Sequence, residues 1–244
     1  MTDQLAFDFS EPAAALPEWA KTLAVFDLET TGLDLSDARI VTACVAQIDE
    51  FGQLVGEAVE WLADPVIEIP TQASDVHGVT TEIARRDGRD AGKVVAEILA
   101  KLQSFFSAGI PVVAYNAPYD FTILHNEALR HGHAPLLDPK PIIDPLVIDK
   151  FVDQYRRGKR TLSVTTEHYG IKLADAHNST ADAVAAGQVA QAIARVHGAK
   201  LPATALELHA LQPEWSKAQD ISFEKFMKGN NPDFVARIGW PTKL

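Results

Sequence analysis

Short apolar runs dominate the first third of the chain, and a more polar stretch precedes them. Residues 1 to about 20 mix Asp, Glu, Ser and Pro with an Ala run and show no sustained periodicity, so we expect a flexible N-terminal tail. Three strand-like runs follow at 22–29, 39–49 and 53–62, with a turn at 50–52 between the last two. These runs predict a meander of three strands.

The rest of the chain alternates helical periodicity with short apolar runs. The helix pattern at 90–106 places Val94, Ile98, Leu102 and Phe105 on one stripe. Further along, the pattern predicts strands at 110–115 and from 142, and helices at 118–130, 161–169 and 179–196. Strands first, then alternating strands and helices, predict an α/β fold in which helices cover a mixed sheet.

The C-terminal segment has a pattern of its own. A chain of 244 residues that is 47% apolar can hold one medium domain with additions, and we place a catalytic domain at 21–200. Residues 201–244 contain a predicted helix at 203–215, followed by Phe223, Phe226 and Trp240. Because aromatic side chains in a polar tail usually pack onto the domain, we expect a C-terminal helical extension docked there.

Composition and charge limit the cellular compartment and the mode of nucleic-acid binding that we expect. The single cysteine, Cys44, lies in a strand-like run and excludes an internal disulfide, which suits a reducing compartment. No segment approaches the roughly 18 apolar residues of a membrane span, so we expect a soluble cytoplasmic protein. The net charge of −11 argues against a broad electrostatic grip on nucleic acid, although divalent cations would reverse the local field in a cleft.

Four carboxylates and one imidazole lie where elements begin or end. Asp27 and Glu29, two apart at the end of the first predicted strand, project to the same face. Asp120 lies at the start of a predicted helix, and Asp182 follows His177 at the start of another. Four carboxylates with a histidine are the inventory of a two-metal phosphodiesterase.

Each of these residues also has a structural alternative. Asn116 with Asp120 could be a helix cap and a first-turn acid, and Ser179 with Asp182 matches a capping box. His177 alone could be a hydrogen-bonded surface histidine. None of these alternatives explains why the segments occur together in this order.

Three motifs resemble those of one family. F-D-L-E-T-T-G-L, N-A-P-Y-D-F and H-N-S-T-A-D, in this order, resemble the exonuclease motifs of the DEDDh class, the family of the proofreading epsilon subunit of bacterial DNA polymerase III. The resemblance covers roughly residues 22–197. The segment V-H-G-V-T looks like the family's segment after the third strand, and the region from D-P-L-V-I-D to the terminal W-P looks most like free-standing actinobacterial and phage members.

The resemblance implies a fold and a mechanism. The fold is ribonuclease H-like, with a five-stranded mixed sheet and helices on both faces. Asp27, Glu29, Asp120 and Asp182 would bind two divalent cations, Mg²⁺ or Mn²⁺, with Asp27 bridging them and His177 acting as general base. The implied reaction releases 5′-mononucleotides from the 3′ end of DNA, most simply single-stranded, in replication or repair and without a nucleotide cofactor.

Candidate substrate contacts are less specific. We expect the following residues to contact substrate: Thr30, His77, Asn116, Phe121, Arg156, Arg157, Lys159 and Arg160. The last four form the only dense basic run, which suits backbone phosphates, with a solvated loop as the alternative. Core packing is the alternative for Phe121 and a structural role the alternative for His77.

Two further questions stay open from the sequence. The tail segment Gln4 to Phe9 resembles the glutamine-led peptides that bacterial proteins insert into the sliding clamp, so a clamp is a possible partner. Nothing in the motifs reads a 2′-hydroxyl, so an exoribonuclease of the same class is an alternative. A non-catalytic nucleic-acid-binding module is a third hypothesis, which the intact acid set opposes.

Overall fold

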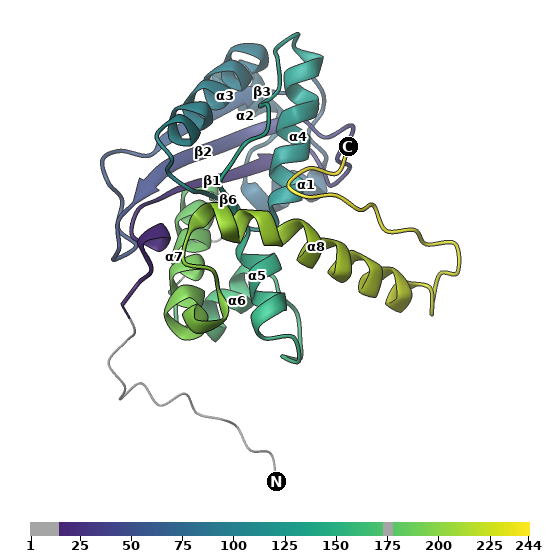
Figure 1. Cartoon of the computed structure of the whole chain (residues 1–244). Coiled ribbons are helices and arrows are strands. Elements are labelled where there is room, and N and C mark those ends of the chain that lie inside the picture. Colours follow the sequence, from purple (N-terminus) through teal and green to yellow (C-terminus); the bar gives the residue numbers. More distant parts are fainter. Residues whose placement is uncertain (1–14, 173–177) are drawn as a thin grey trace.

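A mixed sheet forms the centre of the protein in the computed structural model, which describes residues 15–172 and 178–244 (Figure 1). The strand order is β4-β3-β2-β1-β5-β6. The strands are β1 (Leu23–Thr30), β2 (Ile40–Ile48), β3 (Val59–Asp64), β4 (Arg89–Asp90), β5 (Val112–Val113) and β6 (Ile142–Ile143). β1, β2 and β3 are antiparallel neighbours, whereas β5 is parallel to β1 and β6 is parallel to β5. The five predicted strands are present, and the two-residue β4, parallel to β3, adds a sixth.

The third strand begins later than its apolar run. The prediction placed it at 53–62, but residues 53–58 contribute only an isolated bridge from Leu54 to Ile48. The predicted turn before it is present, and Gly52 has the positive φ of 73° that favours glycine. β3 also ends two residues later than predicted, at Asp64, which pairs with Asp90 of β4.

Helices cover both faces of the sheet (Figure 1). They are α1 (Thr71–His77), α2 (Thr81–Asp87), α3 (Ala91–Ser107), α4 (Ala117–Arg130), α5 (Pro145–Val152), α6 (Leu162–His168), α7 (Ser179–His197) and α8 (Ala205–Met227), with short 3₁₀ turns at Glu18–Ala20 and Gly198–Lys200. The pattern predicted α3, α4, α6 and α7 to within about two residues. It did not predict α1, α2 or α5.

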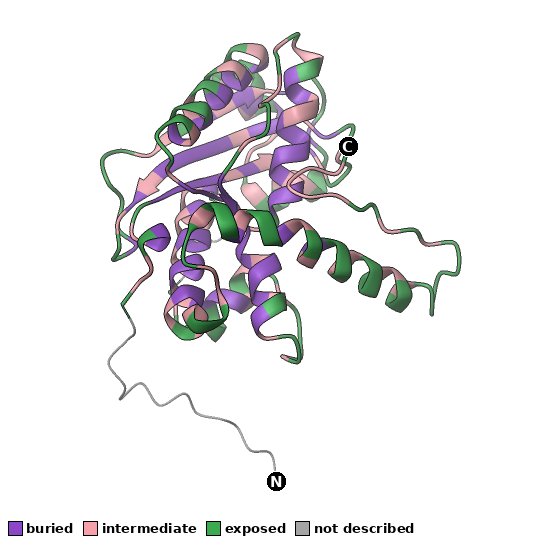
Figure 2. Ribbon diagram, viewed as in Figure 1, coloured by how far each residue is buried: buried purple, intermediate pink, exposed green. Residues whose placement is uncertain are grey.

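Side chains of β1 alternate between two apolar cores. Ala24, Phe26 and Leu28 pack with α3 and α4, whereas Leu23 and Val25 pack with α5 and α7. The central strand is therefore buried on both faces, as the buried colouring in Figure 2 shows. Such burial fixes the direction in which the carboxyl end of β1 points.

One glycine lets α7 approach the sheet closely. A Cβ atom added at Gly187 would lie 2.5 Å from Ile48 Cδ1 and 2.6 Å from Val25 Cγ1. Both distances are far shorter than an ordinary van der Waals contact. The absence of a side chain at Gly187 therefore sets the depth at which α7 packs on β1 and β2.

Residues after 200 contact the domain through a longer helix than expected. α8 continues past Pro213 to Met227, so the predicted end at Trp215 is wrong. Leu208 and Gln212 of its first half are fully buried, and the Gln212 side chain accepts from Asp144 N–H and donates to Ile142 O. Trp240 packs on the core, whereas Phe223 and Phe226 remain exposed. The division into domain and extension stays a prediction.

At the other end of the chain, packing begins before residue 21. Trp19 and Ala20 are buried in the core formed with α7. The suggested clamp peptide, Gln4 to Phe9, lies outside the described residues. No helix in the described parts of the chain is long and apolar enough to cross a membrane.

Candidate active site

Asp27 and Glu29 lie at the carboxyl end of β1, as predicted from the strand pattern. They face Cys44 and Thr42 of β2, and the pairing becomes irregular between Glu29 and Thr30. Both acids are half-buried, while Leu28 between them points into the core. The strand therefore presents two carboxylates on one face at the edge where it ends.

Asp120 joins them from the first turn of α4. It is buried, and its Oδ1 accepts a hydrogen bond from the Leu28 backbone N–H at 3.1 Å. Asn116 is the N-cap residue of α4, in the left-handed conformation at φ 67°, but its side chain makes no cap hydrogen bond. The capping alternative therefore fails for the Asn116 side chain, whereas Asp120 is a first-turn acid of α4 that is also hydrogen-bonded to the strand between the other two acids.

Asp182 enters from the first turn of α7. The cap of this helix is Asn178, whose side chain accepts from Thr180 N–H at 3.0 Å and from Ala181 N–H at 3.2 Å. The capping-box alternative for Asp182 is therefore wrong, because Ser179 is inside the helix. His177, the expected base, immediately precedes Asn178 and lies outside the described residues.

The charges of the four acids affect one another's pKa values. Burial, together with the charges of Asp120, Glu29 and Asp182, raises the pKa of Asp27 well above its usual range. Burial and then the charge of Asp182 raise the pKa of Glu29 to about 7. Burial also raises the pKa of Asp120, although two backbone N–H groups oppose the effect. Carboxylates this close favour protons or cations that reduce their mutual repulsion.

The donor chemistry of this cluster fits divalent cations. Four carboxylates offer only hard oxygen ligands, which Mg²⁺ and Mn²⁺ prefer. Within residues 15–172 and 178–244, however, no group of three or more His, Cys, Asp or Glu side chains is arranged so that it could hold a metal ion. The acids are near enough to raise one another's pKa values without forming a finished coordination shell.

A cavity of about 440 Å³ opens beside Glu29. Thr30, Gly32, His77 and Tyr119 line it. The Gly32 carbonyl accepts from Thr30 Oγ1 at 2.8 Å and from the Tyr119 hydroxyl at 3.0 Å, which fixes the turn after β1. Burial lowers the pKa of His77, and its Nδ1 accepts from Val79 N–H at 3.2 Å, so the ring is neutral at pH 7.

The residues predicted to contact substrate lie in different places: some line the cavity, and others pack or hydrogen-bond within the fold. Thr30 and His77 line the cavity, whereas the backbone N–H of Asn116 donates to Asp144 Oδ1 at 3.0 Å. Phe121 is only 3% exposed and packs edge-on against Phe26 at 5.5 Å between ring centroids. We correct the expectation that Phe121 contacts substrate, because its ring belongs to the core.

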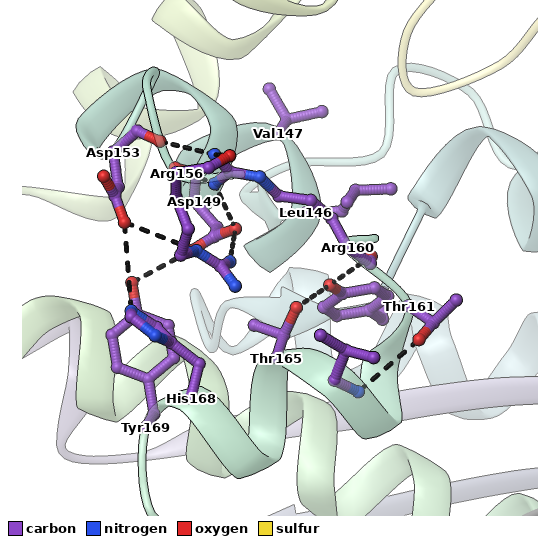
Figure 3. Close-up of polar contacts among 12 residues, drawn as sticks. Leu146, Val147, Asp149, Asp153, Arg156, Arg160, Thr161, Thr165, His168 and Tyr169 are labelled. Atoms are coloured by element: carbon purple, nitrogen blue, oxygen red, sulfur yellow. Dashed lines mark hydrogen bonds and ion pairs between the residues drawn. The ribbon is translucent and has the colours of Figure 1, made fainter. Parts of the chain in front are cut away.

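The four residues of the basic run, Arg156, Arg157, Lys159 and Arg160, also have different surroundings, and Figure 3 shows the contacts of Arg156 and Arg160. Arg156 and Arg160 form ion pairs with Asp149, which is fully buried, and the Tyr169 hydroxyl donates to the same carboxylate at 2.9 Å. Both arginines therefore stabilise a buried acid, and their contact with substrate phosphates stays a prediction. Arg157 and Lys159 are exposed.

Sequence reasoning missed Asp144, which organises the ends of β5 and β6. Its carboxylate accepts from the backbone N–H groups of Asn116 and Ala117, each at 3.0 Å, and caps α5 by accepting from Leu146 N–H at 3.0 Å. Its charge also contributes to raising the pKa of Asp120. The signal was present in I-I-D-P, since aspartate before proline often begins a helix.

Comparison with known proteins agrees with this arrangement. Residues 24–190 match the RNase T family, described as Exonuclease. A DNA polymerase III subunit epsilon-like protein of Rhodobacter capsulatus is 28% identical over 170 residues, which cover 68% of this chain and 23% of that protein. A DNA polymerase III PolC-type protein of Streptococcus suis is 26% identical over 189 residues, or 77% of this chain and 12% of that one.

Solved structures show the same fold. E. coli exonuclease I in complex with a dA16 oligonucleotide superposes with a TM-score of 0.62 at 19% identity, covering 73% of this chain and 42% of that one. The predicted ribonuclease H-like exonuclease fold is confirmed. The matched region spans less than a quarter of each curated relative above and less than half of the solved chain. The family match covers well over half of this sequence, and the chain belongs to the RNase T family of exonucleases.

Proposed function

We propose that the protein is a metal-dependent 3′→5′ exonuclease that releases 5′-mononucleotides from single-stranded DNA. The observation that carries this proposal is the convergence of Asp27, Glu29, Asp120 and Asp182 from β1, α4 and α7. A fold stabilised by its own contacts has no need of four carboxylates that raise one another's pKa values. A hydrolase of phosphodiesters, whose substrate brings more negative charge, has such a need when cations are bound.

The four acids would hold two divalent cations. When bound, such ions lower the pKa of water and stabilise charge on the leaving oxygen. Asp120 is held in place by its hydrogen bond from Leu28 N–H, so it would meet the ions already oriented. His177 would accept the proton of the attacking water, because a histidine with an ordinary pKa near 6.5 is largely neutral at pH 7.

The cavity beside Glu29 would receive the terminal nucleoside. Its walls combine the fixed turn at Gly32 with the neutral ring of His77 and the apolar side chains of Leu33 and Val76. A neutral, largely apolar wall suits a base and sugar better than a phosphate. The terminal phosphodiester would then lie against the acids at the cavity's edge.

The choice of DNA is supported by the relatives. Two have DNA polymerase III in their names, and exonuclease I has been solved in complex with a dA16 oligonucleotide. Exonuclease I has also been solved with dT13. An exoribonuclease of the same class is the alternative that the following assay addresses.

The direct test uses matched 20-nucleotide DNA and RNA strands, labelled at the 5′ end, with Mg²⁺ or with EDTA. We expect a ladder of labelled DNA products that shorten from the 3′ end, release of 5′-monophosphates, and no reaction in EDTA. Asp37→Ala is a matched control for Asp27→Ala, because Asp37 is an exposed acid in the loop after β1. Internal cuts, or equal degradation with EDTA, would refute the proposal, and faster RNA degradation would correct its substrate.

A further inference from the structure

A groove separates the last turn of α5, and the loop that follows it, from the second half of α8. Its volume is about 860 Å³. Phe151 lines one side, and Trp215, Phe223 and Phe226 line the other. It shares no lining residue with the cavity beside Glu29, so it is a second surface whose use the proposed chemistry does not explain.

The aromatic rings of the groove are exposed to an unusual degree. Phe151 is 42% exposed, Phe223 51% and Phe226 70%, and the second half of α8 lies mostly at the surface (Figure 2). Phe151 stacks on Trp215 with centroids 3.8 Å apart and planes within 8° of parallel. A cluster of exposed rings costs solubility, and such patches usually mark interaction sites.

The charge of the groove is opposite to that of the whole chain. Among its lining residues are Lys150, Arg156 and Arg160, and no Asp or Glu. Asp149 pairs with both guanidinium groups and Asp153 pairs with Arg156, so these four side chains together carry no net charge, and Lys150 adds one positive charge to the groove. Exposed Arg157 and Lys159 flank Gly158 of the same loop. In a chain of net charge −11, an acid-free aromatic groove suits a polyanion with flat faces.

The groove is physically joined to the acids through α5. This helix begins after Asp144, whose carboxylate accepts from the Asn116 and Ala117 N–H groups at the start of α4, the helix that carries Asp120 in its first turn. Eight residues make α5 about 12 Å long. The loop is also tied to the strand ends, because the Tyr115 hydroxyl donates to Arg160 O at 2.8 Å. A strand whose 3′ end lies at the acids could reach the groove within a few nucleotides.

We propose that this groove binds the single strand of nucleic acid upstream of the 3′ end, with bases stacked on Phe151, Phe223 and Phe226 and phosphates near Arg157 and Lys159. The inference rests on the proposed exonuclease function and names where the rest of its substrate lies. Stacking on rings tolerates any base, which an enzyme that shortens strands of every sequence requires. It would offset the weak electrostatic attraction of an acidic protein for DNA.

Binding and turnover test the proposal separately. In EDTA, a 5′-fluorescein-labelled dT20 is titrated with the full chain while its anisotropy is measured. We expect Phe226→Ala, and the Arg157→Gln/Lys159→Gln pair, each to raise the Kd at least about 5-fold. The second variant should also flatten the salt dependence of the Kd. Phe51→Ala is the matched control, because Phe51 is 73% exposed in the turn between β2 and β3.

Activity with Mg²⁺ supplies the second measurement. The ratio of kcat/KM for dT20 to that for a trinucleotide should fall in the groove variants, because only the longer strand reaches the groove. A Kd for dT20 that stays the same in both groove variants overturns the proposal and leaves a protein ligand to explain the exposed rings. Failure of the wild type to degrade either substrate would instead refute the exonuclease function, while the titration in EDTA would still decide whether the groove binds the strand.

Discussion

Two sites in this protein contain buried carboxylates in opposite electrostatic surroundings. Around Asp149, the fold supplies its own countercharges: two arginines and a tyrosine hydroxyl surround one fully buried acid. Around Asp27, the principal charged neighbours are three more acids, and burial raises the pKa further. The first cluster is complete without any ligand, whereas the second remains strained until protons or cations reach it.

This difference helps to distinguish buried acids that stabilise the fold from buried acids that are candidates for catalysis. A buried acid with arginine partners stabilises the fold only as long as every partner is present, so it is evidence about packing. Acids that raise one another's pKa values oppose folding, and such sites are candidates for function. Mutations in the two clusters should therefore affect different measurements.

The largest effect is expected at Asp27. Asp27→Ala should lower turnover by at least about 10⁴-fold, roughly 5.5 kcal/mol, because it removes one of the four acids proposed to hold the ions. The same change relieves repulsion, so the melting temperature without metal should stay equal or rise. Asp37→Ala should alter neither value. Near-wild-type activity of Asp27→Ala would falsify the two-metal assignment.

The opposite pattern is expected at Asp149. Asp149→Ala removes the buried acid that two largely buried guanidinium groups share, leaving Arg156 with Asp153 and Arg160 with backbone carbonyls, and should lower the free energy of unfolding by about 3–5 kcal/mol in urea denaturation. Asp87→Ala removes the exposed pair with Arg86 and should change the free energy of unfolding far less, because water screens this pair. If both variants lost equal stability, Asp149 could not be the anchor described above.

Asp144 lies between the two extremes, because backbone N–H groups surround it. Burial raises its pKa from 3.8 to about 6, so the folded state binds this proton more tightly than the unfolded chain. Its contribution to stability is therefore fully present below about pH 4 and is lost as pH rises through about 6. Relative to Asp144→Asn, the wild type should lose up to about 3 kcal/mol of unfolding free energy between pH 4 and pH 7. A difference that does not vary with pH would contradict this assignment.

The smallest of these effects is expected at His177. His177→Ala should lower the rate by about 10²-fold, roughly 2.7 kcal/mol, and should remove the acidic limb of the pH–rate profile. Binding of dT20 in EDTA should not change. A limb that persists in the variant would mean that another group, and not His177, titrates with activity.

The strand and the two helices that carry the acids were predicted to within about two residues of their ends. Asp27 and Glu29 were placed on one face because strand alternation is local, and Asp120 and Asp182 were placed at helix starts by motif. That the four share one site was inferred from the family resemblance, and the mutual pKa effects agree with it. The assignment of ligands and base remains a prediction, since His177 lies outside the described residues.

Errors came where long-range partners decide the outcome. Arg156 and Arg160 looked like solvent-facing cations because Asp149, their partner, lies within the unrecognised α5. Phe121 follows Asp120 directly, and only the helical turn shows that it points toward Phe26. The helix predicted at 203–215 continues to Met227, and the Gln212 side chain donates to Ile142 O of β6, which helps to hold the first half of α8 on the sheet.

Gly187 connects the apolar core to the proposed reaction. It lies five residues after Asp182 on the same helix, where a single added methyl group would collide with Val25 and Ile48. Val25 is two residues before Asp27 on β1. The close packing at Gly187 thus sets the distance between the acid on α7 and the acids on β1, although Gly187 itself lies in the apolar core. Substitutions in this part of the core and the positions of the proposed catalytic acids are therefore coupled, because the same close contact determines both.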